Sequence, residues 1–183
     1  MIKAIITDFD GTLVDTFEAN YGAYQEAFAQ AGLELSRIRY RECFGLRFAE
    51  FMEAMGITDP EIAARIRKIK GEAYPKHFDK LVPNKALIEF IRTSRAQGIR
   101  TAVASTARGK NLMNALNYIG ATDAFEYILT GEDVQHGKPA PEIYNKVLAH
   151  FDIQPSEALV FEDSPVGMQA AEAAGINYIK VTI

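Results

Sequence analysis

The fold of this chain is decided by the stretch Ala4-Ile5-Ile6-Thr7-Asp8-Phe9-Asp10-Gly11-Thr12-Leu13-Val14-Asp15-Thr16. It opens with a short apolar run, which is typical of a strand buried on both faces in a parallel sheet. Asp8 and Asp10 follow where that strand ends, and open α/β sheets bind their ligands at this end. Two acids so close together repel each other unless a positive group lies between them, and a hard cation such as Mg2+ is the natural partner. Gly11 permits a sharp turn and is expected to leave its N–H free to face an anion.

The composition is that of an ordinary globular protein. The chain has 183 residues, of which 48% are hydrophobic and 24% charged, and this fits one domain, or one domain with a modest insert. A net charge of -4 and a pI of about 5.5 give no sign of a basic surface for nucleic acid. The single cysteine, Cys43, cannot form an internal disulfide and is expected to be a small core residue. No signal peptide or membrane-spanning stretch is apparent, so the expected location is the cytoplasm.

Residues 17–80 read as an inserted helical domain. Apolar residues recur every three or four positions between 21 and 31, and Gly32 is a good stop for that helix. Further helices are expected over 37–44, over 48–55, and after the N-cap Asp59 with its proline at the first helical position. No stretch in this region reads as a strand. We therefore expect a helical cap at 17–80 and a catalytic core made of 1–16 and 81–183.

Strand and helix patterns alternate after Pro83. Strands are expected at 99–104, 127–129, 158–161 and 178–181, and the intervening helices end near Gly98, Gly120, Phe151 and Gly175. This βαβα alternation predicts an α/β fold, in which helices flank a Rossmann-like parallel sheet with right-handed crossovers.

Two further polar segments follow predicted strands or precede predicted helices. Ser105 and Thr106 stand just after a strand, where a hydroxyl and the N–H groups of a helix start can hold a phosphate. Taken alone, Ser105 is better explained as a turn or N-cap residue, and only its place in the series of strand ends favours the phosphate role. Lys138 lies in the segment Gly137-Lys138-Pro139-Ala140-Pro141. A solvated loop lysine is the usual alternative, but a loop stiffened by proline can aim its ammonium into a site, where it would neutralise a phosphoryl oxygen.

The strand at 158–161 ends in a second pair of acids, Glu162 and Asp163. Asp163 could complete a cation site with Asp8 and the backbone carbonyl of Asp10, and Glu162 could orient a metal-bound water. Ser164 has a structural explanation as the N-cap of the helix that starts at Pro165. Polar strand ends of one parallel sheet converge on one crevice, so these acids are expected to lie near Asp8.

The order of these motifs, D-x-D-G-T, then S/T, G-K-P-x-P and E-D-S, resembles the haloacid dehalogenase (HAD) superfamily. A helical insert directly after the first motif resembles its helical-cap group, which includes beta-phosphoglucomutase and phosphoglycolate-phosphatase-like hydrolases. The resemblance implies an Mg2+-dependent enzyme in which Asp8 is the nucleophile that forms an aspartyl-phosphate and Asp10 is the general acid and base. Haloacid dehalogenases of the superfamily lack the second acid, so Asp10 favours phosphoryl transfer.

The same resemblance assigns the remaining site residues. It implies a phosphate site at Gly11, Ser105, Thr106 and Lys138, metal ligands at Asp8, Asp10 and Asp163, and a supporting role for Glu162 behind the metal. In the cap, Arg47 and Lys70 resemble positions with which beta-phosphoglucomutase grips its substrate, although a solvated cap face explains them equally well. Asn20 stands where a mutase typically has histidine.

The expected function is hydrolysis of a small phosphorylated metabolite. Two alternatives stay open: a sugar phosphomutase of the beta-phosphoglucomutase type, and a non-catalytic HAD-fold binding protein. Neither nucleic acid nor a membrane is expected as a partner, and a monomer or weak homodimer is expected. The sequence does not identify the substrate, because cap side chains determine it.

Overall fold

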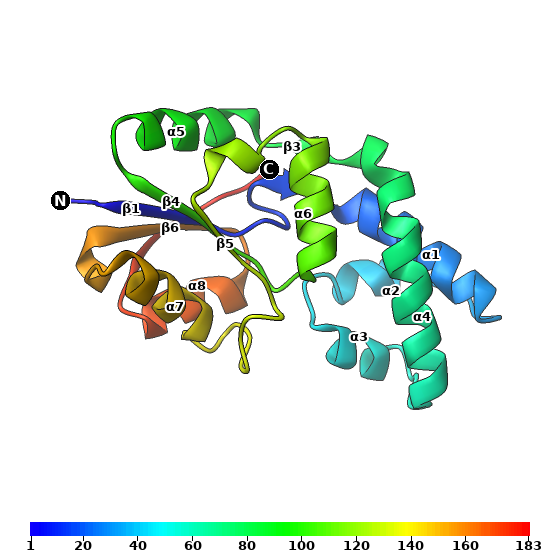
Figure 1. Cartoon of the computed structure of the whole chain (residues 1–183). Helices are drawn as coiled ribbons and strands as arrows, with labels where there is room; N and C mark the ends of the chain where they lie inside the picture. The colour runs from blue at the N-terminus through cyan, green and yellow to red at the C-terminus, as the bar shows by residue number, and fades with distance from the viewer. The chain divides into compact units, whose positions relative to one another are not determined.

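A computed structural model describes residues 1–183. The chain divides into two compact units: residues 1–15 with 82–183, called the core unit here, and residues 16–81, called the helical unit. Figure 1 traces both along the chain from blue to red. No helix combines the length and apolar character that crossing a membrane requires.

The core unit is built on a five-stranded sheet in the order β5-β4-β1-β6-β7, and every neighbouring pair is parallel. The strands are β1 (Ala4–Thr7), β4 (Arg100–Ala104), β5 (Tyr127–Leu129), β6 (Ala158–Glu162) and β7 (Asn177–Lys180). The predicted parallel α/β sheet is therefore confirmed. β1 lies at the centre of the sheet and all four of its residues are buried, which is why its sequence is an almost continuous apolar run.

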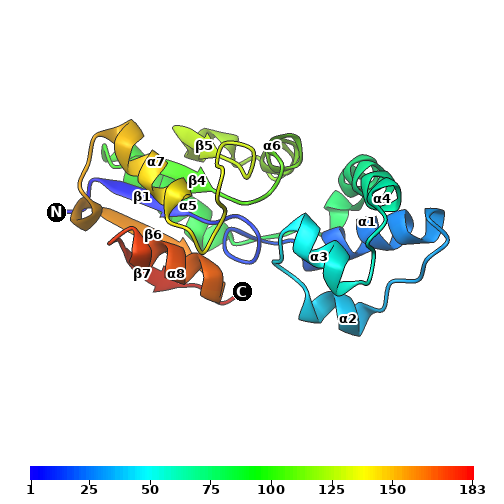
Figure 2. The ribbon, with the colours of Figure 1, turned by 90° about the horizontal axis from the view of Figure 1, so that it is seen from below.

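Helices cover both faces of this sheet. They are α5 (Lys85–Ala96), α6 (Gly109–Tyr118), α7 (Glu142–Phe151) and α8 (Pro165–Ala173), with short 3-10 turns η2 (Thr122–Ala124) and η3 (Pro155–Glu157). The side of α5 lies opposite that of α7 and α8 (Figures 1 and 2). Between the sheet and the latter two helices lies a core that includes Ile6, Val160, Tyr144, Val147 and Ala170.

The two shortest strands of the core unit were not predicted. β2 (Val14–Asp15) pairs antiparallel with β3 (Val82–Pro83), with Val14 opposite Pro83. Two-residue strands are too short to show alternation, so no sequence pattern distinguishes them from loop. The pair joins the two chain segments of the core unit at the points where the chain leaves it and returns.

The helical unit contains only helices and turns, as the sequence predicts. They are α1 (Phe17–Gln30), α2 (Arg37–Glu42), α3 (Phe48–Ala54), α4 (Pro60–Ala73) and the 3-10 helix η1 (Tyr74–Lys80). The predicted cap at Asp59 is present, because its carboxylate accepts hydrogen bonds from Glu61 N and Ile62 N. Tyr40 lies at the centre of an aromatic core and packs against Phe17 and Phe51, among others. Cys43 is buried in the same cluster.

Candidate active site

Parallel strands bring the predicted polar residues to one edge of the sheet. The register places Thr7 of β1 opposite Val103 of β4 and Phe161 of β6. The residues that follow, among them Asp8, Ser105 and Glu162, therefore leave neighbouring strands at the same carboxyl end. The Asp8 N–H extends the ladder by donating to the Phe161 carbonyl at 3.0 Å.

Lys138 joins two acids of this edge. Its ammonium donates to Asp8 Oδ1 at 2.6 Å and to Glu162 Oε1 at 2.5 Å. All three side chains are buried, and Glu162 is fully inaccessible. Charge-assisted hydrogen bonds are the short and strong ones, so the loop lysine is held inside the structure and its solvated alternative is excluded.

Asp163 belongs to the same cluster of acids. Its Oδ1 accepts from the Thr12 hydroxyl at 2.7 Å. One oxygen from each of Asp8, Glu162 and Asp163 lies within 4.8 Å of the others. Thr12 was not among the predicted site residues, because its partner lies 151 positions away; its only signal is the hydroxyl that follows the Asp-Gly pair.

The charges in this cluster do not balance. Burial raises the pKa of Asp8 well above its usual range, Lys138 opposes that shift, and the Glu162 carboxylate adds to it. Burial also raises the pKa of Asp163, although the Thr12 hydroxyl opposes the shift. Burial works against the charge of Lys138, but Asp8 and Glu162 outweigh it and hold the Lys138 pKa well above its usual value. The cluster thus holds three acids and one ammonium, which contacts two of them, and an excess of negative charge suits a divalent cation.

Gly11 has a different role from the predicted one. Its N–H donates to the Val14 carbonyl at 2.8 Å, so the expectation of a free N–H facing an anion is wrong: closing the turn toward β2 consumes this donor. Glycine is needed here for two other reasons. Its φ is +87°, and a Cβ would lie 2.3 Å from Asp163 Oδ2.

The segment after β4 is compact. Ser105 is buried, and its Oγ accepts a hydrogen bond from Ala107 N at 3.1 Å. Thr106 is exposed. Gly131 lies against this segment so closely that a Cβ would meet the Thr106 carbonyl oxygen at 2.4 Å. The turn role of the Ser105 hydroxyl is therefore present.

Both carboxylate oxygens of Glu162 accept hydrogen bonds. Its Oε2 accepts from Asp163 N, Ser164 N and the Ser164 hydroxyl, each at 3.0 Å. Ser164 Oγ also accepts from Gly167 N at 3.1 Å, which confirms the predicted N-cap of α8. Glu162 thereby links the start of α8 to Lys138.

Gly167 leaves the space that the Glu162 side chain occupies. A Cβ at this position would lie 1.8 Å from Glu162 Oε1, so we expect Gly167→Ala to destabilise the fold by about 1–3 kcal/mol through overpacking and to displace Lys138. The matched control is Gly71→Ala in α4, where no atom lies within 4 Å of the added Cβ and alanine is expected to be neutral or stabilising. Urea unfolding of both variants measures the effect; equal stability for the two would contradict the prediction.

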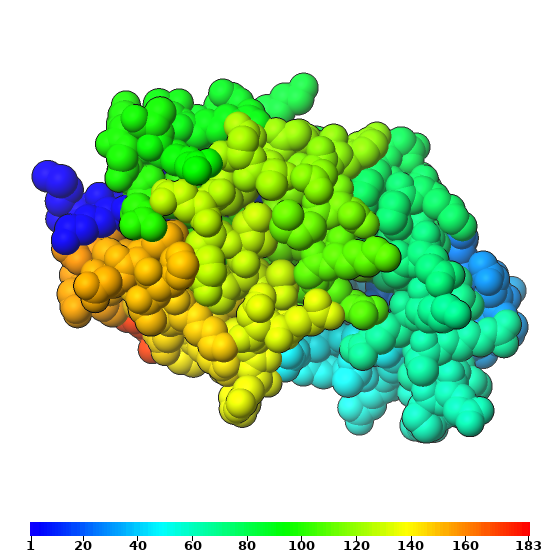
Figure 3. Space-filling view, viewed as in Figure 1, coloured from blue at the N-terminus to red at the C-terminus, as the bar shows by residue number.

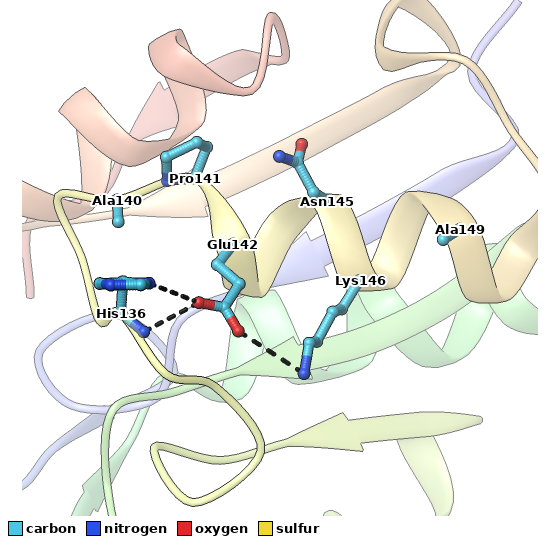
Figure 4. A pocket seen from close by; sticks show the side chains of 7 residues that line it. All are labelled: His136, Ala140, Pro141, Glu142, Asn145, Lys146 and Ala149. Atoms are coloured by element: carbon cyan, nitrogen blue, oxygen red, sulfur yellow. Dashed lines mark hydrogen bonds and ion pairs between the residues drawn. The ribbon is translucent and has the colours of Figure 1, made fainter.

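Glu142, the first residue of α7, binds the loop before Lys138 through hydrogen bonds at the surface. Its carboxylate accepts from Gln135 N at 2.9 Å and His136 N at 2.8 Å, and it pairs with Lys146 at 3.6 Å. Figure 4 shows the His136 and Lys146 contacts in a surface hollow of about 450 Å³ beside α7, and in Figure 3 the yellow segment before α7 lies at the surface. None of the acids of the site lines this hollow.

Glu142 gives a prediction on acid stability. The backbone N–H groups of Gln135 and His136 lower its pKa to about 2, so the ionised form stabilises the fold above the unfolded value of about 4.3 and this contribution is lost as the pH falls toward 2. Glu142→Gln removes the effect. We expect the variant to be less stable at pH 7 and the difference to shrink between about pH 4.3 and 2. Thermal unfolding against pH tests this, and a pH-independent difference would refute it.

The two cap candidates lie in the helical unit. Arg47 is exposed and stands at the N-cap of α3, where its backbone N–H donates to Glu50 Oε2 at 3.2 Å. The Lys70 ammonium lies 4.3 Å from the ring centre of Tyr74 and 5.1 Å from that of Tyr24. Both distances are typical of cation–π contacts, so the Lys70 ammonium packs against two aromatic rings.

Known proteins match this chain over almost its whole length. A family model described as haloacid dehalogenase-like hydrolase matches residues 5–181. Protein CbbY of Rhodobacter capsulatus is 34% identical over 97% of this chain and 84% of its own length. A phosphorylated carbohydrates phosphatase of Thermotoga maritima is 29% identical, with 97% and 84% covered.

Solved structures show the same fold. A crystal structure of a CbbY variant from Rhodobacter sphaeroides, in complex with xylulose-(1,5)bisphosphate, is similar with a TM-score of 0.90 and 30% identity over 100% of this chain and 87% of that one. The chain therefore belongs to the haloacid dehalogenase-like hydrolases, among the phosphoglycolate-phosphatase and beta-phosphoglucomutase type, and is a phosphomonoester hydrolase of this superfamily.

Proposed function

We propose that this chain is an Mg2+-dependent phosphatase of small phosphorylated sugars that works through an aspartyl-phosphate on Asp8. The observation that carries the proposal is the buried cluster in which Lys138 joins Asp8 and Glu162 beside Asp163. Relatives named for phosphorylated carbohydrates and a solved relative in complex with a sugar bisphosphate support the substrate class.

The donor set fits Mg2+. Hard cations of this size take oxygen ligands, and the cluster offers carboxylate oxygens within 4.8 Å of one another with negative charge in excess. We assign the metal to the carboxylates of Asp8 and Asp163 and the backbone carbonyl of Asp10, with Glu162 behind them. When bound, Mg2+ supplies Lewis-acid stabilisation of the phosphoryl oxygens and lets an anionic nucleophile approach an anionic phosphate.

The protein groups then divide the chemistry. Asp8 attacks phosphorus, the bond from phosphorus to the ester oxygen breaks, and Asp10 gives its proton to the leaving oxygen. Lys138 and the hydroxyl of Ser105 bind the transferring phosphoryl group, and the backbone N–H of Thr106 assists them. Asp10 next takes a proton from water, which attacks the phosphorus of the aspartyl-phosphate and restores Asp8. The site thus hydrolyses the ester in two steps.

Asn20 favours water over a sugar as the phosphoryl acceptor. It is buried in α1, and its amide donates to Thr16 Oγ1 at 3.0 Å. A neutral amide does not exchange protons near neutral pH, whereas a histidine does. A mutase-like sequence has histidine at this position, so Asn20 argues for hydrolysis.

Arg47 and Lys70 are proposed to set substrate choice within the helical unit. Both are cations, and a phosphorylated sugar offers anionic or hydroxyl oxygens for such groups. Replacing either should raise KM for the best substrate and leave the identity of the nucleophile unchanged.

The test is phosphate release from a panel of phosphorylated metabolites that includes sugar mono- and bisphosphates, measured with Mg2+ and with EDTA. We expect release from sugar phosphates that requires Mg2+ and is reversed by chelation. Equal release with EDTA would refute the metal role. Isomerisation of a glucose phosphate that needs a bisphosphate activator, without net phosphate release, would establish the mutase in place of the phosphatase.

A further inference from the structure

Tyr144 lies beneath the site without taking part in the proposed chemistry. It is the third residue of α7 and fully buried. Its hydroxyl donates to Glu162 Oε1 at 3.2 Å, and its ring centre lies 5.2 Å from the Lys138 ammonium. The side chain therefore contacts both members of the Lys138–Glu162 ion pair.

The two carboxylate oxygens of Glu162 accept hydrogen bonds from different groups. Oε2 is saturated by the three donors of Asp163 and Ser164, which fix the position of the carboxylate. Oε1 accepts from only Lys138 and Tyr144. The hydroxyl of Tyr144 is therefore the group that shares Oε1 with the ammonium.

The ammonium itself is shared between Asp8 and Glu162. Two donors on one carboxylate oxygen compete for its negative charge, so the hydrogen bond from Tyr144 weakens the hold of Oε1 on Lys138. Without that donor, Glu162 draws the ammonium toward itself and away from Asp8 and any anion beside it.

We propose that Tyr144 is a positioning residue that directs the Lys138 ammonium toward the phosphoryl group by hydrogen bonding to Glu162 Oε1. The inference deepens the proposed function and rests on it, because it gives Lys138 a phosphoryl group to hold. The ring of Tyr144 contributes separately, since its face is turned to the ammonium at a cation–π distance.

Tyr144→Phe removes the hydroxyl and keeps the ring. The probe is inorganic phosphate, titrated calorimetrically into the Mg2+-loaded protein. Because the ammonium of Lys138 is then drawn toward Glu162 and away from the anion, we expect the dissociation constant for phosphate to rise several-fold. The KM for the best substrate should rise in parallel.

Tyr178→Phe is the matched control. It also loses a tyrosine–glutamate hydrogen bond, from Tyr178 to Glu172 Oε1 at 2.9 Å, but this hydrogen bond is exposed and belongs to a half-buried residue of β7. Its phosphate affinity should equal that of the wild type. In a Glu162→Gln background, where Oε1 no longer carries a charge, Tyr144→Phe should add little further loss.

The outcomes separate this inference from the proposed function. Wild-type protein that binds phosphate, together with Tyr144→Phe that binds it equally well, would overturn the positioning role alone and leave Tyr144 as a core residue. Loss of thermal stability with unchanged phosphate affinity would do the same. Wild-type protein that binds no phosphate in the presence of Mg2+ would overturn the proposed function and this inference with it.

Discussion

Asp8→Asn is expected to lower phosphate release by at least about a thousandfold, because an amide cannot serve as the nucleophile that forms the acyl phosphate. The fold should survive the change. Asparagine keeps the shape and one acceptor oxygen for Lys138, which contacts Asp8 at 2.6 Å, and it removes one carboxylate from a cluster with excess negative charge. Single-turnover phosphate release and thermal unfolding, measured on the same sample, check both halves of this prediction.

Asp152→Asn provides the matched control for that experiment. Asp152 is the exposed C-cap of α7 with φ 51°, and asparagine tolerates this left-handed conformation. The same chemical change should there leave activity and stability unaltered. Activity that persists in Asp8→Asn after the control behaves as expected would identify another nucleophile.

The parallel sheet could be predicted because buried strands have apolar sequences that can be recognised. β1 is buried on both faces and therefore apolar. Among the helices between strands, α5, α6 and α8 end at glycines that stop them, whereas α7 ends at Asp152. The same logic located the acids, since strand ends are where an apolar run gives way to Asp8 or to Glu162. Topology then brings those ends together whatever the loops between them contain.

The partners within the site could not be predicted in the same way. The Thr12 hydroxyl donates a hydrogen bond to Asp163, which lies 151 positions later in the sequence. No local sequence pattern indicates a pairing over such a distance. Tyr144 follows the apolar period of its helix, so it reads as an ordinary core aromatic and its hydroxyl contact with Glu162 is invisible in the sequence. Gly11 was expected to offer its N–H, but that donor closes onto Val14, in a two-residue strand too short to recognise.

Among the substitutions considered, Lys138→Met is expected to lower the free energy of unfolding most. The variant leaves the buried carboxylates of Asp8 and Glu162 without their only shared cation, and removing one partner of a buried ion pair costs about 3–5 kcal/mol. Mg2+ should offset part of the loss, because it brings positive charge to the same cluster. Urea unfolding with and without Mg2+ measures both effects, and activity should fall together with phosphate binding.

The pH dependence of that deficit separates charge from packing. Burial and Glu162 raise the pKa of Asp8 in the wild type, and loss of the ammonium removes the group that opposes this shift. The uncompensated charge of Asp8 then disappears as this carboxylate takes up a proton, so the deficit of Lys138→Met should shrink as the pH falls. Lys146→Met, whose ammonium is half-exposed and pairs with Glu142 at 3.6 Å, should change stability far less. A deficit that stays constant from neutral to acid pH would mean that Lys138 supports the fold through its packed stem, and that its charge is not what the cluster requires.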